Sequence, residues 1–103
     1  MKESDWKTFK IIKKKAIEQF CTRALDEFET VISDTNEPVH NRYLLLYKLV
    51  QNRDKEMSFI FDNHSQSNAR MQLTMIRANG LADGSLLVEL SDEFREQTDP
   101  KRL

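Results

Sequence analysis

The stretch of sequence that decides the fold runs from residue 9 to residue 31 and reads FKIIKKKAIEQFCTRALDEFETV. Its main apolar residues recur at spacings of three or four, as Phe9, Ile12, Ala16, Phe20, Ala24, Phe28 and Val31. Such spacings place side chains on one face of an α-helix, whereas a strand alternates at every second residue. We therefore expect a long amphipathic helix from Asp5 to about Ile32, with an apolar face wide enough to contact more than one neighbour.

A second long helix follows after a short polar turn. Residues 33–37 are polar, and Pro38 suits the first turn of a helix. The next stripe alternates spacings of four and three, which is a heptad pattern, through Val39, Tyr43, Leu46, Val50, Arg53, Met57, Ile60 and His64. We expect this helix to run from Pro38 to about Asn63. A short turn between two long helices predicts an antiparallel helical hairpin over residues 5–63.

The remaining third of the chain predicts a pair of shorter helices over residues 67–97. The first would present Ala69, Leu73 and Ile76 and end at Asn79-Gly80, where glycine can adopt the left-handed conformation that closes a helix. Asp83 or Ser85 could cap the second, whose buried face would be Leu86, Leu87, Leu90 and Phe94. The expected fold is therefore all-α, with four helices in one domain over residues 1–103.

The composition bears on the number of domains, the compartment and the partners of the protein. The chain has 103 residues, which is the usual size of one domain, and its two Gly and two Pro leave room for long helices. Cys21 is the single cysteine, and no signal-like apolar run follows Met1, so we expect a reducing cytoplasm. Apolar runs are too short to span a membrane. The net charge of −1 gives no overall attraction to nucleic acid.

Few residues could carry catalysis or bind a metal. His40 and His64 lie at opposite ends of one expected helix, so they cannot share a metal within one subunit, and Cys21 fits a helix core. Asp62 and His64 lie near Ser65 and Ser67, but helix capping explains that polar segment better than nucleophilic catalysis. No glycine-rich phosphate loop is present. The sequence favours a non-catalytic protein without a cofactor or metal.

Charge is unevenly distributed along the chain. Residues 1–15 carry six Lys, whereas residues 83–99 carry six acidic groups against Arg95. Lys7, Lys10 and Lys14 share one helix face, which Lys13 and Lys15 extend. This face is either a solvated surface near the acidic segment, in the fold or across an oligomer, or a contact surface for nucleic acid. We favour the first interpretation.

Arg53 interrupts the apolar stripe of the second long helix. A charged group there is costly unless it is paired, and Glu27 or Asp26 of the first helix could supply the carboxylate. Such a pair could fix the register of the helices, or Arg53 could instead line a polar pocket for an anionic ligand. We favour the structural role.

The two long helices carry more apolar surface than two short helices can cover. Large exposed apolar patches usually mark interfaces, and the commonest solution is a symmetric dimer. We therefore expect a small helical interaction or adaptor protein that forms a dimeric bundle. A nucleic-acid-associated regulator and a ligand-binding protein or enzyme with a site near Arg53 are the alternatives. The expected homodimer interface comprises Tyr43, Leu46, Val50, Met57 and Ile60.

Overall fold

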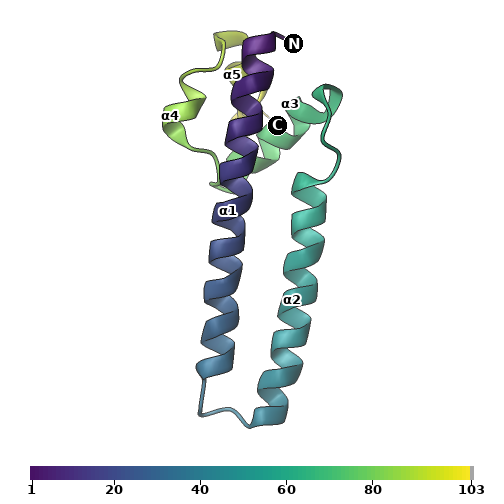
Figure 1. Ribbon diagram of the computed structural model, residues 1–103, viewed down its shortest axis with the longest axis vertical. Coiled ribbons are helices and arrows are strands. Elements are labelled where there is room, and N and C mark those ends of the chain that lie inside the picture. Colours follow the sequence, from purple (N-terminus) through teal and green to yellow (C-terminus); the bar gives the residue numbers. More distant parts are fainter. Residues whose placement is uncertain (103) are drawn as a thin grey trace.

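The computed structural model describes residues 1–102, and the secondary structure in that range is helical throughout. Helices α1 (Glu3–Ser33) and α2 (Val39–Phe61) lie side by side and run in opposite directions (Figure 1). They are followed by α3 (Gln66–Ala78), α4 (Gly84–Leu87), α5 (Asp92–Gln97) and a short 3₁₀ helix, η1 (Pro100–Arg102). The all-α class is confirmed.

The molecule is elongated. Its extents are 53 × 23 × 23 Å, and its radius of gyration is 16.7 Å, against about 13 Å for a compact domain of 100 residues. Helices α3, α4 and α5 gather around the N-terminal half of α1, and the rest of the α1–α2 pair extends away from them (Figure 1). We call residues 20–57 the stalk and the remaining residues, 1–19 and 58–102, the head.

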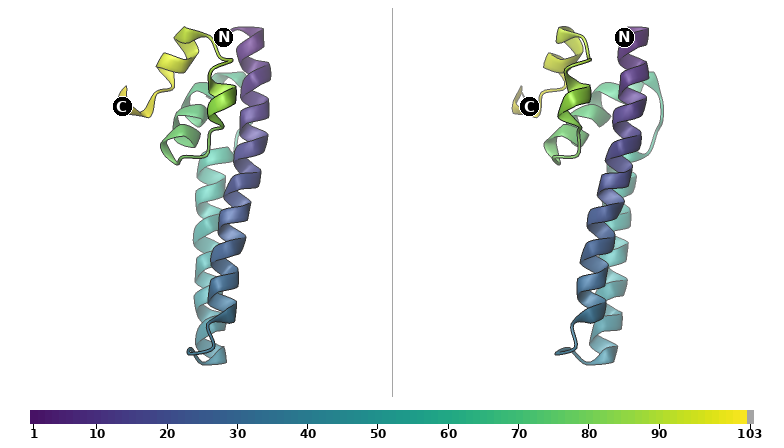
Figure 2. Two further views of the ribbon diagram at one scale, coloured as in Figure 1. Left: turned by 90° about the vertical axis from the view of Figure 1, so that its left-hand side faces the viewer. Right: turned by 60° about the vertical axis from the view of Figure 1, so that its left-hand side comes forward.

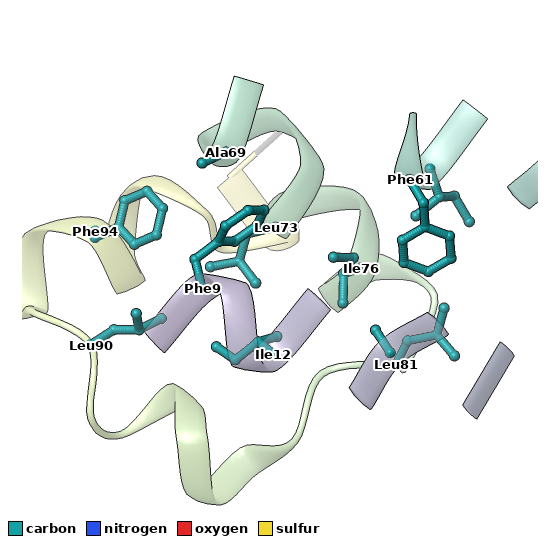
Figure 3. Close-up of a cluster of buried hydrophobic side chains, with 11 residues drawn as sticks. Phe9, Ile12, Phe61, Ala69, Leu73, Ile76, Leu81, Leu90 and Phe94 are labelled. Atoms are coloured by element: carbon teal, nitrogen blue, oxygen red, sulfur yellow. The ribbon is translucent and has the colours of Figure 1, made fainter. Parts of the chain in front are cut away.

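The apolar core lies in the head. One face of α1 packs against the C-terminal end of α2, α3 and the segment from α4 to α5. The cluster comprises Phe9, Ile12, Ala16, Ile60, Phe61, Ala69, Leu73, Ile76, Leu81, Leu90 and Phe94 (Figure 3). In the stalk, by contrast, Ala24 is the one buried residue between positions 20 and 57. Most of the hydrophobic stabilisation of one chain is therefore concentrated at one end.

Helix α3 ends where the sequence indicates. Gly80 has φ +67°, its N–H donates to the Arg77 carbonyl at 3.1 Å, and the Leu81 N–H donates to the Ile76 carbonyl at 3.0 Å. These are the two hydrogen bonds of a Schellman motif. Ile76 and Leu81 are both buried in the core cluster, so the turn that closes α3 also directs the chain back toward α1.

The second helix of the pair expected over residues 67–97 is instead two short helices, α4 and α5. The break lies before Ser91, whose N–H donates to Asp5 Oδ1 at 2.8 Å and whose hydroxyl donates to Asp5 Oδ2 at 2.6 Å. Ser91 Oγ also accepts from the Phe94 N–H and so caps α5. Asp5 is only 3% exposed. Because the Ser91 amide bonds to Asp5, it is not available to continue a helix from α4, and α5 is fixed to the first turns of α1.

We predict that Asp5→Ala destabilises the protein by about 2–3 kcal/mol, because the substitution removes two hydrogen bonds and leaves two part-buried donors of Ser91 without partners. Urea unfolding followed by circular dichroism measures this change. The control is Glu3→Ala, which removes an exposed carboxylate from the same helix end and should cost about 0.5 kcal/mol. Equal losses in the two variants would show that Asp5 acts only through the helix dipole.

Candidate interaction surface

Arg53 lies between the two helices of the stalk and is fully engaged with carboxylates. Its Nε donates to Glu27 Oε1 at 3.0 Å, and its Nη2 donates to Glu27 Oε2 at 2.9 Å. Its Nη1 donates to Glu56 Oε1 at 2.9 Å. Of the two partners suggested by the sequence, Glu27 is the one in contact. The hydrogen bond from Arg53 lowers the pKa of Glu27, and the same bond raises the pKa of Arg53. The bidentate pair fixes one register of α1 against α2.

A depression of about 240 Å³ lies next to Arg53, between the stalk and the end of α3. Arg23, on its wall, donates to the carbonyls of Asn79 and Gly80 at 3.3 and 3.1 Å, and so satisfies the end of α3. Both arginines of this depression are thus bonded to groups of the chain itself. The charge at Arg53 is thus paired with carboxylates of the chain itself.

One side of the stalk is uncovered. Helices α3, α4 and α5 lie on one side of the α1–α2 pair (Figure 2). Ile12 faces them in the core, and Lys14, two residues and about 200° further around α1, points to the opposite side. The same side of α1 carries Cys21, Leu25, Phe28 and Ile32, which follow Lys14 at successive intervals of seven, four, three and four residues.

Helix α2 contributes to the same uncovered side. Val50 and Met57 line a shallow groove of about 270 Å³ with Cys21, Leu25 and Phe28. Tyr43 lies seven residues before Val50, so it shares its side of α2. We call this surface the bare side and define it as Cys21, Leu25, Phe28 and Ile32 of α1 with Val39, Tyr43 and Val50 of α2.

The bare side exposes large apolar groups. Leu25 is 63% exposed, Ile32 54% and Tyr43 66%. Cys21, which we expected in the core, is only half-buried, because no helix lies above it. The bare side therefore has the composition of a core layer without a covering layer.

The residues expected at a dimer interface fall into two groups. Tyr43 and Val50 are exposed on the bare side. Leu46 and Met57 are half-buried, and Ile60, at 4% exposed, belongs to the core of its own chain. The residues of the α2 heptad pattern thus lie on two different surfaces of the helix. Part of it packs against α1 within the chain, and the positions beside that contact remain free.

The lysine face also lies on α1, in the head. Lys7, Lys10 and Lys14 are exposed and make no ion pair within residues 1–102. Lys10 Nζ lies 5.5 Å from the centroid of the Trp6 ring, within range of a cation–π interaction. Lys15 pairs with Asp83 at 3.3 Å, which is the one direct ion pair between the basic segment and the acidic segment.

Lys13 does not belong to the lysine face, contrary to our expectation. It is 6% exposed, donates to Gln72 Oε1 at 3.2 Å, and lies 3.3 Å from His64 Nδ1. Burial lowers the pKa of Lys13, and the nearby Asp62 carboxylate partly opposes this shift. Gln72 in turn donates to the carbonyls of Asp62 and Asn63 at the end of α2. This polar cluster ties α1, α2 and α3 together.

The other residues considered for catalysis or metal binding do not form a site. His64 contacts Lys13 and the Trp6 ring, while Ser65 bonds to Ser67 and Asn68 in the first turn of α3. Within residues 1–102, no three His, Cys, Asp or Glu side chains converge as a metal site would require. No helix in the same range is long and apolar enough to cross a bilayer.

The candidate site is therefore a surface, with an apolar part on the stalk and a basic part on the head. Comparison of the chain with models of protein families, with characterised proteins and with solved structures gives no match.

We predict that Glu27→Gln lowers the stability by about 0.5–1 kcal/mol at pH 7, a small effect because Glu27 is 44% exposed and solvent screens the pair. The pKa of Glu27 is lower in the folded state than in the unfolded state. Its contribution is therefore present above the range of an ordinary glutamate, about pH 4, and is lost as the pH falls through the lowered value.

Unfolding midpoints of Glu27→Gln and of the unsubstituted protein should thus converge in acid. Asp26→Asn removes the neighbouring exposed carboxylate, which does not contact Arg53, and serves as the control. A constant difference between pH 7 and pH 3 would contradict the assigned role of the pair.

Proposed function

We propose that this chain is a non-catalytic helical interaction protein that self-associates through the bare side of its stalk. The observation that carries the proposal is the row of apolar side chains on that side, among them Leu25, Ile32 and Tyr43. Contiguous apolar surface of this kind is uncommon on soluble monomers and usually marks an interface.

A second copy of the chain fits this surface for a geometric reason. Two helices form one layer, and helical proteins become stable when such a layer packs against another. Two stalks placed with their bare sides together would form a four-helix bundle. The contact would be isologous, because the same patch is used by both copies, and this is the commonest form of homodimer.

The proposed setting is the cytoplasm, and the proposed role is that of an adaptor whose head presents other surfaces to a partner protein. The half-buried free thiol of Cys21 suits a reducing compartment. The polar atoms of Lys13, Arg53 and Asp5 are all bonded within the chain, which supports structural roles for the charged residues placed inside the fold.

We predict that Leu25→Asp converts a dimer into a monomer without unfolding the chain. Leu25 is largely exposed in one chain, so the charge would be costly only if a second copy covers it. Light scattering at micromolar concentration gives the mass, and circular dichroism reports the helical content.

The matched control is Phe59→Asp. Phe59 is 75% exposed and lies nine residues from Val50, half a turn around α2 from the bare side. This variant should remain dimeric. A monomeric mass for the unsubstituted protein would end the proposal, and so would an unchanged dimer in Leu25→Asp.

Nucleic-acid binding is the second candidate, favoured by the three exposed lysines at positions 7, 10 and 14. Phosphate contacts would give retention on nucleic acid that falls steeply with salt concentration. Replacing the three lysines by glutamine should then abolish retention while the helical content stays unchanged. Absence of retention even at low salt would remove this candidate.

A further inference from the structure

We infer that the two copies pair antiparallel, so that the lysine face of each head lies beside the acidic tip of the other stalk. The inference rests on the proposed self-association and adds its direction and its polar contacts. It is carried by a stripe on α1 and by the charges at the two ends of that helix.

The stripe runs the full length of α1 on the side away from α3, α4 and α5. Its members are spaced alternately by four and three residues, which is a heptad pattern. They are Lys7, Ile11, Lys14, Glu18, Cys21, Leu25, Phe28 and Ile32. Each is exposed or half-buried in the single chain. The half in the head is mainly polar and basic, and the half in the stalk is apolar.

The far end of the stalk carries the opposite charge. Between Arg23 and Arg42 the chain has no Lys or Arg, but it has five acidic residues: Asp26, Glu27, Glu29, Asp34 and Glu37. Asp34 and Glu37 lie in the turn between α1 and α2, and Asp34 is exposed there. The molecule therefore has a basic face at one end of α1 and an acidic tip at the other.

Distances along the helix bring these two ends into register. The midpoint of the apolar half lies between Leu25 and Phe28. At 1.5 Å per residue, Lys14 is roughly 19 Å from this midpoint toward the head, and the turn that starts at Asp34 begins roughly 11 Å away on the other side and continues outward. A two-fold axis through the midpoint would place the Lys14 region of each copy beside the Asp34–Glu37 turn of the other.

The parallel alternative is electrostatically unfavourable. With both heads together, the lysine faces would adjoin each other, and so would the acidic tips. The antiparallel arrangement replaces both repulsions with attractions. The two heads also stay apart in it, because they lie at opposite ends of the pair, and α3, α4 and α5 lie on one side of the α1–α2 pair (Figure 2). Charge thus selects the direction, and apolar contact supplies most of the affinity.

Single-cysteine variants test the direction. In a Cys21→Ser background, Glu18→Cys and Thr35→Cys place thiols at exposed positions on the two sides of the proposed axis, one on α1 and one in the turn after it. An equal mixture of the two variants, treated with a short thiol crosslinker, should give a covalent heterodimer by mass spectrometry. Each variant alone should crosslink poorly. The two thiols of Glu18→Cys would lie roughly 26 Å apart along the helix, and those of Thr35→Cys would lie toward opposite ends of the dimer.

The crosslinking pattern and the mass together distinguish the antiparallel direction from self-association itself. A dimeric mass with self-crosslinking of each variant, or with no crosslinking at all, would overturn the antiparallel direction and leave self-association standing. A monomeric mass would overturn both. Light scattering on the same samples supplies the mass.

A charge exchange tests the polar contact independently. Lys14→Glu should weaken the dimer several-fold at low salt, and adding Glu37→Lys in the same chain should restore it. Both positions lie outside the head core, so helical content serves as the folding control. An unchanged dimer affinity in Lys14→Glu, with reduced retention on nucleic acid, would assign the lysine face to nucleic acid and overturn the contact.

Discussion

The structure depends on how much of α1 the rest of the chain can cover. Helix α1 has 31 residues and is roughly 46 Å long. Its first half meets α2, α3 and the segment from α4 to α5, which bury Phe9, Ile12 and Ala16 completely. Beyond Arg23, which bonds to the end of α3, helix α2 is its main neighbour. Helix α3 has 13 residues, and α4 and α5 are shorter still, so the chain cannot build a second layer along the stalk. The bare side follows from this shortage of covering elements.

Polar contacts decide how the covering elements dock. The Asp5 carboxylate determines where α5 begins, and the cluster of Lys13, His64 and Gln72 joins the end of α2 to α1 and α3. Both sites bury groups that would be costly if left unpaired. The polar atoms at Arg53 play the same part in the stalk, where they align α1 with α2. Apolar burial supplies the driving force, and these few contacts specify one arrangement.

The periodic features of the sequence predicted the elements that depend on local pattern. The stripe from Phe9 to Val31 and the Asn79-Gly80 stop correspond to α1 and to the end of α3. Long-range contacts escaped prediction. Nothing local indicates that Asp5 bonds to Ser91, and so the break between α4 and α5 was missed. Lys13 was grouped with its lysine neighbours, although its position four residues after Phe9 places it on the buried face of the helix. In α2, the heptad pattern did not distinguish positions that pack within the chain, such as Ile60, from positions that stay exposed in it, such as Tyr43.

The link between Asp5 and Ser91 also bears on the order in which the molecule folds. These residues are 86 positions apart in the chain, whereas the stalk joins segments separated only by a short turn. Local contacts of this kind form early, and contacts that close long loops form late. During synthesis, the stalk can therefore form while Leu90 and Phe94 are still absent and part of the α1 core face is open to water. The segment that carries Leu90 and Phe94 completes the head, so its removal would leave the core face of α1 incompletely covered and prone to aggregation.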